Sequence, residues 1–266
     1  MSRYKYFAGL FILGCINGLG SRAINSVHSL GWTDALLDTF GVSLIVWVAC
    51  YKGIELILQE AAGSILRTDL VLGVGLLALV SLPIGGASWL AITLLGLYIL
   101  WAGAPSNVQR RGTIILLAAA VPMLWSPMFF RYFANFVLEV DASLIGLLLG
   151  TGNTGNVVPF RDGSGSLMIL PVCSSLANVS LAFLAWVTIT NWLPHKWSLR
   201  DVCWCLLAAV SVITVNVTRM SLMGLSQQHY NVFHSQIGDM VANLVLISLI
   251  LTICLSGARS GSNVQA

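Results

Sequence analysis

Long apolar runs separated by short polar islands dominate the pattern of this chain. A helix that spans a membrane needs about 20 apolar residues, and the charged residues divide the chain into segments of that order of length. The pattern predicts eight spans, with bounds near 6–20, 35–58, 69–84, 88–103, 112–130, 173–193, 202–222 and 238–256. It indicates an all-α integral membrane protein, formed as one polytopic domain over residues 1–266.

The longest connection between predicted spans runs from Arg131 to Val172 and carries two further elements. Residues 135–149 have apolar side chains at helical spacing, which predicts a helix that lies along the outer leaflet or dips into it. Two short apolar runs, 157–160 and 167–170, flank the turn-forming residues 161–165. This pattern is typical of a small β-hairpin, which we expect at the outer membrane surface before the sixth span.

The hairpin leads directly into the sixth span. Pro171 ends the second predicted strand, and Ser174 and Ser175 supply the N-cap chemistry that begins a helix over residues 176–192. Cys173 would then lie at or just before a helix N-terminus. Unpaired amides and the positive end of the helix dipole favour a thiolate over a thiol at such a position.

Composition supports the membrane assignment, and the distribution of charge predicts an orientation. Of the 266 residues, 57% are hydrophobic and 9% are charged, and a soluble domain of this kind would expose large apolar patches. With the N-terminus in the cytoplasm, nine of the 13 Lys and Arg residues lie inside, and the four outside are Arg22, Arg131, Arg161 and Arg219. The bias predicts a multi-pass protein of the cytoplasmic (inner) membrane with both termini in the cytoplasm. The net charge of +3 then reflects orientation in the lipid bilayer, and we expect no nucleic-acid partner.

Three polar residues at the ends of predicted spans are not explained by orientation alone. Cys173 begins the sixth span, Arg219 ends the seventh within Asn216-Val-Thr-Arg219, and His234 shortly precedes the eighth. Because Cys173 precedes one span and Arg219 follows the next, all three would face the same side. A thiol, an imidazole that takes its proton and a cation that stabilises an oxyanion meet the needs of thiol acyl transfer.

Each of these residues also has a structural explanation. A cysteine at a helix start is more often structural than catalytic, and Arg219 could be an interfacial anchor. His229, five residues earlier, is a rival for His234, and we expect it in the looser loop Ser226-Gln-Gln-His229-Tyr. A metal site made of His229, His234 and Asp239 lacks ligand spacing on one helical face, so we expect no metal and no cofactor.

Three segments, in this order and at these span ends, resemble the exosortase/archaeosortase family of eight-span membrane proteins. They are Pro-Val-Cys173-Ser-Ser-Leu after a Gly-rich hairpin, Asn216-Val-Thr-Arg219, and Phe233-His234-Ser-Gln-Ile-Gly238. The resemblance covers residues 129–251, and across the first hundred residues it is limited to hydropathy and span count. The family usually has glycine where this chain has Ser175.

The resemblance implies a cysteine transpeptidase or protease whose active site lies at the outer face of the cytoplasmic membrane. Its expected substrates are exported proteins with a C-terminal motif, a transmembrane segment and a basic tail, cleaved or transpeptidated at the motif. It implies that Cys173 is the nucleophile, Arg219 the electrostatic partner and His234 the general acid/base. The supporting residues are Asn216 and the amides of Ser174 and Ser175, and these amides would hold the oxyanion together with Arg219.

Two alternatives stay open at the level of sequence. A non-catalytic membrane component of exopolysaccharide synthesis or export would need polar groups along a path through the bundle, and few charges lie in the middle of the predicted spans. An inactive member of the family would show the same sequence pattern. The sequence also leaves open whether the thioester passes to water or to an acceptor amine, and which motif is recognised.

Overall fold

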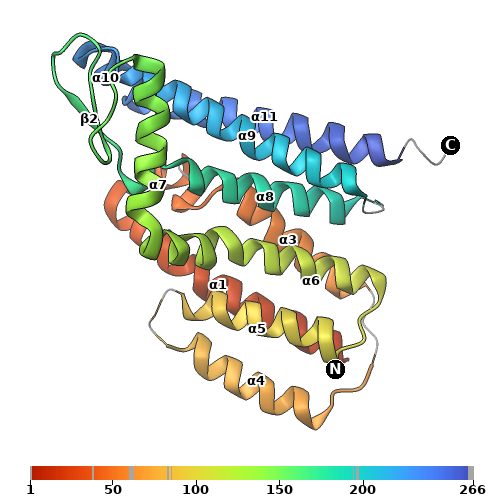
Figure 1. Ribbon diagram of the computed structural model, residues 1–266. Helices are drawn as coiled ribbons and strands as arrows, with labels where there is room; N and C mark the ends of the chain where they lie inside the picture. Colours follow the sequence, from red (N-terminus) through yellow and green to blue (C-terminus); the bar gives the residue numbers. More distant parts are fainter. Residues whose placement is uncertain are drawn as a thin grey trace. The chain divides into compact units, whose positions relative to one another are not determined.

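The computed structural model describes residues 2–37, 39–59, 63–82, 84, 86–193, 195 and 198–262. These residues are mostly helical, and the only sheet among them is a two-stranded hairpin (Figure 1). Contacts divide the chain into two compact units, which we describe separately. Unit 1 comprises Met1–Trp125 and Val187–Pro194, and unit 2 comprises Ser126–Trp186 and His195–Ala266.

Unit 1 is a bundle of helices with short connections. Its elements are α1 (Arg3–Leu30), α2 (Trp32–Leu37), the 3-10 turn η1 (Thr39–Gly41), α3 (Leu44–Gln59), α4 (Arg67–Val80), α5 (Ala87–Ala102), α6 (Asn107–Ala120) and the π-helical turn η2 (Val121–Trp125). Helices α3 and α6 approach closely at two glycines, since a Cβ atom on Gly112 would lie 2.6 Å from the carbonyl oxygen of Gly53. Only residues without a side chain permit this backbone contact.

A buried ion pair joins the beginnings of α1 and α4. The Arg3 guanidinium donates to both carboxylate oxygens of Asp69, at 2.7 and 2.8 Å. The Tyr98 hydroxyl of α5 donates to the same carboxylate at 2.8 Å, and the amide of Leu66 donates to it at 2.8 Å. Because the carboxylate has several donors, both charges are satisfied within unit 1.

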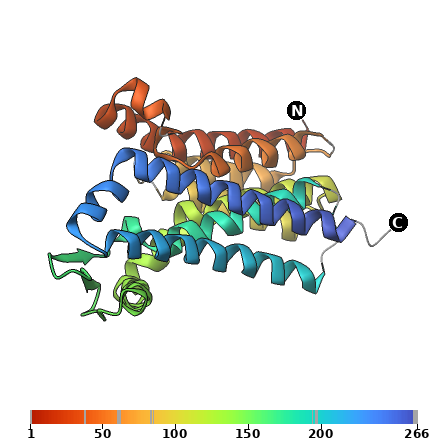
Figure 2. The same ribbon diagram turned by 90° about the horizontal axis from the view of Figure 1, so that it is seen from above.

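Unit 2 combines the hairpin and a short helix with longer helices before and after them. Its elements are α7 (Ser126–Leu149), β1 (Val157–Pro159), β2 (Ser166–Met168), the 3-10 turn η3 (Pro171–Cys173), α8 (Ser175–Trp192, whose last residues belong to unit 1), α9 (Leu199–Met223), α10 (Gln227–Phe233) and α11 (Gln236–Ser262). Helices α9 and α11 run side by side, with the hairpin and α10 at one end of the pair (Figures 1 and 2).

The apolar core of unit 2 lies under the hairpin. It includes side chains of α7, both strands and the last turns of α9, namely Leu138, Ala142, Ile145, Leu149, Val158, Phe160, Leu167, Ile169, Val217, Met220 and Met223. The two strands therefore cover the ends of α7 and α9 and do not project into solvent as an independent hairpin. An isolated two-stranded hairpin is at best marginally stable, so this core holds the hairpin in place.

Four helical runs among the described residues are long and apolar enough to cross a membrane. They are Arg3–Leu30, Asn107–Leu149, Leu199–Met223 and Ile237–Ser260, and Ala87–Ala102 is a shorter apolar helix. The chain therefore has the helices of a multi-pass membrane protein, which confirms the predicted all-α class. The count of eight spans stays a prediction.

One of the predicted spans is wrong. The predicted span 35–58 is interrupted between α2 and α3, because Thr39, Phe40 and Gly41 have φ values of 51°, 59° and 67°. A right-handed helix cannot contain a run of such residues. In the connection predicted over 131–172, Phe133 has φ and ψ values of −116° and 15°, which are not helical. The helical run from Asn107 through η2 therefore has a kink at Phe133, between the predicted span 112–130 and the helix expected at 135–149.

A proline accounts for the irregular turn in that helical run. Pro122 lies in η2 and has no backbone N–H for a helical hydrogen bond. A single π-helical turn is a common way for a helix to pass such a defect without ending. The predicted span 112–130 and the predicted helix 135–149 thus lie in one helical run that has a kink between them at Phe133.

Candidate functional site

The predicted hairpin is present in unit 2. Its strands pair antiparallel, with Val158 opposite Leu167, and both of these side chains are buried in the core. The tip is attached to the turn between α9 and α10. The amide of Arg161 donates to the carbonyl of Gly224 at 2.9 Å, and the amide of Gln227 donates to the hydroxyl of Ser164 at 3.2 Å.

The hairpin tip also contains a perturbed carboxyl group. Hydrogen bonds from the hydroxyl and the amide of Ser164 hold the pKa of Asp162 below its ordinary value, and the nearby His229 acts in the same direction. The amide of Ser164 lies 2.9 Å from Oδ1 of Asp162. This arrangement is typical of an Asx turn, which rigidifies a short loop.

Cys173 lies immediately before α8, as predicted. It ends the 3-10 turn η3, and Ser174 follows in an extended conformation as the residue that caps the turn. The hydroxyl of Ser174 accepts a hydrogen bond from the amide of Leu176 at 3.3 Å, which is the N-cap chemistry expected for this serine. Cys173 is half-buried, and its side chain packs against the core of unit 2.

Asn216 of α9 contacts the segment that carries Cys173. Its side-chain amide donates to the carbonyl oxygen of Cys173 at 2.8 Å and to the hydroxyl of Ser175 at 3.1 Å. Asn216 is buried, so water does not compete strongly for these hydrogen bonds. The structure therefore brings Cys173, Ser175 and Asn216 together.

The backbone amides of Ser174 and Ser175 already have acceptors. The amide of Ser174 donates to the carbonyl of Pro171 at 3.3 Å, and the amide of Ser175 donates to Oδ2 of Asp141 at 3.0 Å. An oxyanion hole requires donors aimed at the position of the oxyanion. Because both amides already have acceptors, we do not assign the oxyanion to them in this structure.

Asp141 is a site residue that reasoning from the sequence missed. It lies on α7 and is only 4% exposed. The signal was present, because a single aspartate within an apolar helix is by default a candidate functional residue. Its partner could not be read from the sequence, since Asp141 and Ser175 are 34 positions apart.

Arg219 lies on α9 three residues after Asn216, about one helical turn further along. Its Nη2 donates to the carbonyl oxygen of Phe233 at 3.3 Å and forms an ion pair with Oδ1 of Asp239 on α11. Its Nε is buried and has no hydrogen-bond partner in the described part of the chain. Arg219 is thus held through Nη2 and keeps a buried N–H donor at Nε without a partner in the described part of the chain.

His234 follows α10 directly and is exposed. Its ring stacks on Tyr230, with centroids 5.0 Å apart. The rival His229 was expected in a loose loop, but it lies within helix α10. This expectation was wrong because Ser226 caps the helix, accepting a hydrogen bond from the amide of His229, and its hydroxyl lies 2.8 Å from Nδ1 of the ring.

The predicted catalytic residues come from three elements that meet at one end of α9. Asn216 contacts Cys173, and Arg219 contacts Phe233, the neighbour of His234. Within the described residues, no hydrogen bond or ion pair joins Cys173 directly to Arg219 or His234. The arrangement provides a thiol at a helix start, a cation and an imidazole on adjoining elements.

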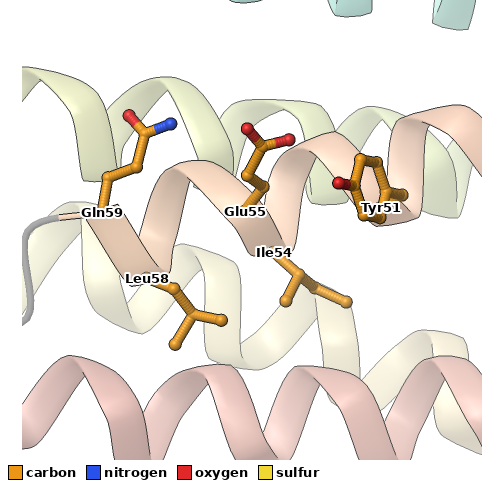
Figure 3. A pocket seen from close by; sticks show the side chains of 5 residues that line it. All are labelled: Tyr51, Ile54, Glu55, Leu58 and Gln59. Carbon is orange, nitrogen blue, oxygen red and sulfur yellow. The ribbon is translucent and has the colours of Figure 1, made fainter.

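A hollow of about 420 Å³ in unit 1 does not involve any of these residues. It lies along α3 and is lined by Tyr51, Ile54, Glu55, Leu58 and Gln59 (Figure 3). Its carboxylate is already paired, since Oε2 of Glu55 lies 2.7 Å from Nζ of Lys52. We therefore assign no chemistry to this hollow.

No three His, Cys, Asp or Glu side chains among the described residues lie close enough together to hold a metal ion. Comparison of the chain with models of protein families, with curated proteins and with solved structures finds no match in any of the three. Function is therefore inferred from the residues of this chain and from the resemblance of its motifs.

Proposed function

We propose that this chain is a membrane-embedded cysteine transpeptidase or protease of the exosortase kind. The observation that supports this most is the position of Cys173. It directly precedes α8, and its carbonyl accepts from Asn216, a residue about one helical turn from Arg219. A thiol at a helix start near a guanidinium has the environment in which cysteines become nucleophilic.

In the proposed reaction, the Cys173 thiolate attacks the carbonyl carbon of the scissile peptide. The oxyanion that forms is stabilised by Arg219, whose Nε has an unused N–H. His234 protonates the leaving amine as the C–N bond breaks, which leaves a thioester on Cys173. Water or an acceptor amine then attacks the thioester and returns the thiol.

The proposal includes a placement in the cell. Eight spans in the cytoplasmic (inner) membrane, with both termini inside, would put Cys173, Arg219 and His234 at the outer face. The bias of Lys and Arg toward predicted inner loops supports this orientation. The expected substrates are exported proteins that end in a short motif, an apolar span and a basic tail.

Co-expression of a tailed exported protein with variants of this chain tests the proposal. Cys173→Ser and Cys173→Ala should abolish processing while the protein still accumulates in the membrane. Cys203→Ser is the matched control, because Cys203 is an exposed cysteine on α9 and should not affect processing. Processing by either Cys173 variant at the wild-type rate would exclude the cysteine mechanism.

The engagement of Arg219 with Asp239 favours one alternative, an inactive member of the family. In such a protein the ion pair would serve only to join α9 and α11. Cys173 variants would then accumulate normally, and the wild type would process no tailed substrate. A non-catalytic component of polysaccharide export would give the same negative result, and loss of polymer secretion in a deletion strain would identify it.

A further inference from the structure

A buried carboxylate lies at the start of the helix that follows Cys173. Asp141 is the residue in question, on α7 and 4% exposed. Burial of a carboxylate is costly unless hydrogen bonds compensate, and the backbone amide of Ser175 donates to Oδ2 of Asp141 at 3.0 Å. This amide belongs to the first turn of α8, where backbone N–H groups lack partners within the helix.

Asn216 holds the same segment through other atoms. Its side chain donates to the carbonyl of Cys173 and to the hydroxyl of Ser175. The three residues from Cys173 to Ser175 are thus fixed by α7 through one hydrogen bond and by α9 through two. Since Cα atoms of neighbouring residues are about 3.8 Å apart, the Asp141 carboxylate lies within about 10 Å of the Cys173 backbone.

We infer that Asp141 is a positioning residue for Cys173, which it holds through Ser175. The inference rests on the proposed function, because it assigns a role relative to the nucleophile. The carboxylate fixes the first turn of α8, and its negative charge occupies the helix end that would also stabilise a thiolate. Asp141 therefore orients the thiol and at the same time lowers its reactivity.

Other charged groups lie at this end of unit 2. Arg219 on α9 forms an ion pair with Asp239 on α11. His234 lies beyond α10 and is exposed. Substitutions at Asp141 leave these three groups in place, so a change in thiol reactivity would report on Asp141 itself.

Two variants separate the hydrogen bond from the charge. Asp141→Asn keeps an oxygen that accepts from the Ser175 amide and removes the charge, whereas Asp141→Leu removes both. Glu139→Gln is the matched control, because Glu139 is an exposed carboxylate two residues away on the same helix. The rate of Cys173 alkylation by a small maleimide is measured between pH 5 and pH 9 in the purified full-length protein, alongside processing of a tailed substrate.

Asp141→Asn should shift the midpoint of the alkylation profile to lower pH by about one unit, equivalent to about a tenfold faster reaction below the midpoint. Glu139→Gln should leave the profile unchanged. Asp141→Leu should lower processing at least tenfold, and it should retain less processing than Asp141→Asn. A capping role that affects stability alone would lower the melting temperature without moving the profile.

An unchanged alkylation profile in Asp141→Asn would overturn the inference, as would full processing by Asp141→Leu. If Asp141→Leu does not accumulate, the profile of Asp141→Asn decides. The alkylation experiment requires no enzymatic activity, so it remains valid if Cys173→Ser shows that the proposed function is wrong. Conversely, Cys173→Ser could lose processing while the alkylation profile of Asp141→Asn stays unchanged. That result would support the proposed function and reject the role of Asp141.

Discussion

Arg219 and Asp239 form an ion pair that joins the end of α9 to the beginning of α11. The same guanidinium nitrogen also donates to the carbonyl of Phe233, so Arg219 is held by two groups on the segment that carries His234. Fixing one side of a guanidinium in this way determines the direction of its other donors. The buried Nε is then a donor of defined orientation.

The first prediction concerns the effect of this cation on Cys173. Arg219→Ala should slow alkylation of Cys173 at neutral pH about threefold to tenfold, because a nearby cation favours the thiolate. Asp239→Asn should accelerate it, because the guanidinium charge is no longer offset. Mass spectrometry of labelled peptides measures the rate, and the buried Cys15, Cys50 and Cys254 serve as slow internal references.

Arg200→Ala is the control for that experiment. Arg200 lies in the first turn of the same helix, about 28 Å from Arg219 along the helix axis, so its removal should not affect Cys173. If Arg219→Ala and Arg200→Ala give the same alkylation rate as the wild type, Arg219 is not an electrostatic neighbour of the thiol.

The second prediction concerns topology. The hairpin is attached to Gly224 at the end of α9, and Arg200 lies at the beginning of this 25-residue helix. Such a helix is about 37 Å long, which is sufficient to span the hydrocarbon core. In intact cells, a membrane-impermeant maleimide should label a single cysteine introduced by Asp162→Cys, whereas Arg200→Cys should be labelled only after permeabilisation. Labelling of Arg200→Cys alone would reverse the proposed orientation.

The third prediction concerns packing within unit 2. A Cβ atom on Gly257 of α11 would lie 2.7 Å from ring carbons of both Trp186 and Trp204. Indole rings are rigid, so Gly257→Ala should destabilise the protein by about 1–3 kcal/mol through overpacking. Thermal unfolding in detergent measures the effect. Gly75→Ala is the control, because the corresponding space next to α4 is open and alanine favours the helix by up to about 1 kcal/mol.

Local sequence signals were sufficient to predict the elements around Cys173. The Gly- and Ser-rich turn between short apolar runs specified the hairpin, and Pro171 followed by Ser174 specified the start of α8. Each of these signals acts within a few residues, through backbone conformation or a side-chain cap. They therefore specify the local conformation, while the stability of the hairpin still depends on the core of unit 2.

The errors came from contacts and conformations that no local pattern specified. The role of Asp141 depends on the packing of α7 beside α8, and the acceptor of the Ser175 amide emerged only from that packing. Helix α10 contains His229, which the sequence analysis places in a loop. The spacing of Ser226 and His229, where a side chain caps the third following amide, was a signal that could have identified it.

The last prediction distinguishes the two histidines. Both are held in place, since the ring of His229 contacts Ser226 and that of His234 stacks on Tyr230. Rigidity alone therefore does not select the general acid/base. His234 has the better position because it follows Phe233, whose carbonyl accepts from Arg219. A general acid must reach the group it serves, and only His234 directly adjoins this contact.

His234→Ala should therefore lower processing of a tailed substrate by about 10²–10⁴-fold with normal accumulation in the membrane, and His229→Ala should retain most activity. Uncleaved substrate on a gel reports the loss, and membrane levels of both variants are measured in parallel. His234→Gln is a further control, because it keeps a polar side chain of similar reach without an acid/base group, and it should be as inactive as His234→Ala.

Equal loss in His229→Ala and His234→Ala together with reduced protein levels would indicate that α10 has a folding role. Full processing by His234→Ala would remove its catalytic assignment, since a thiol acyl transfer without a proton donor at this position would need another group to protonate the leaving amine.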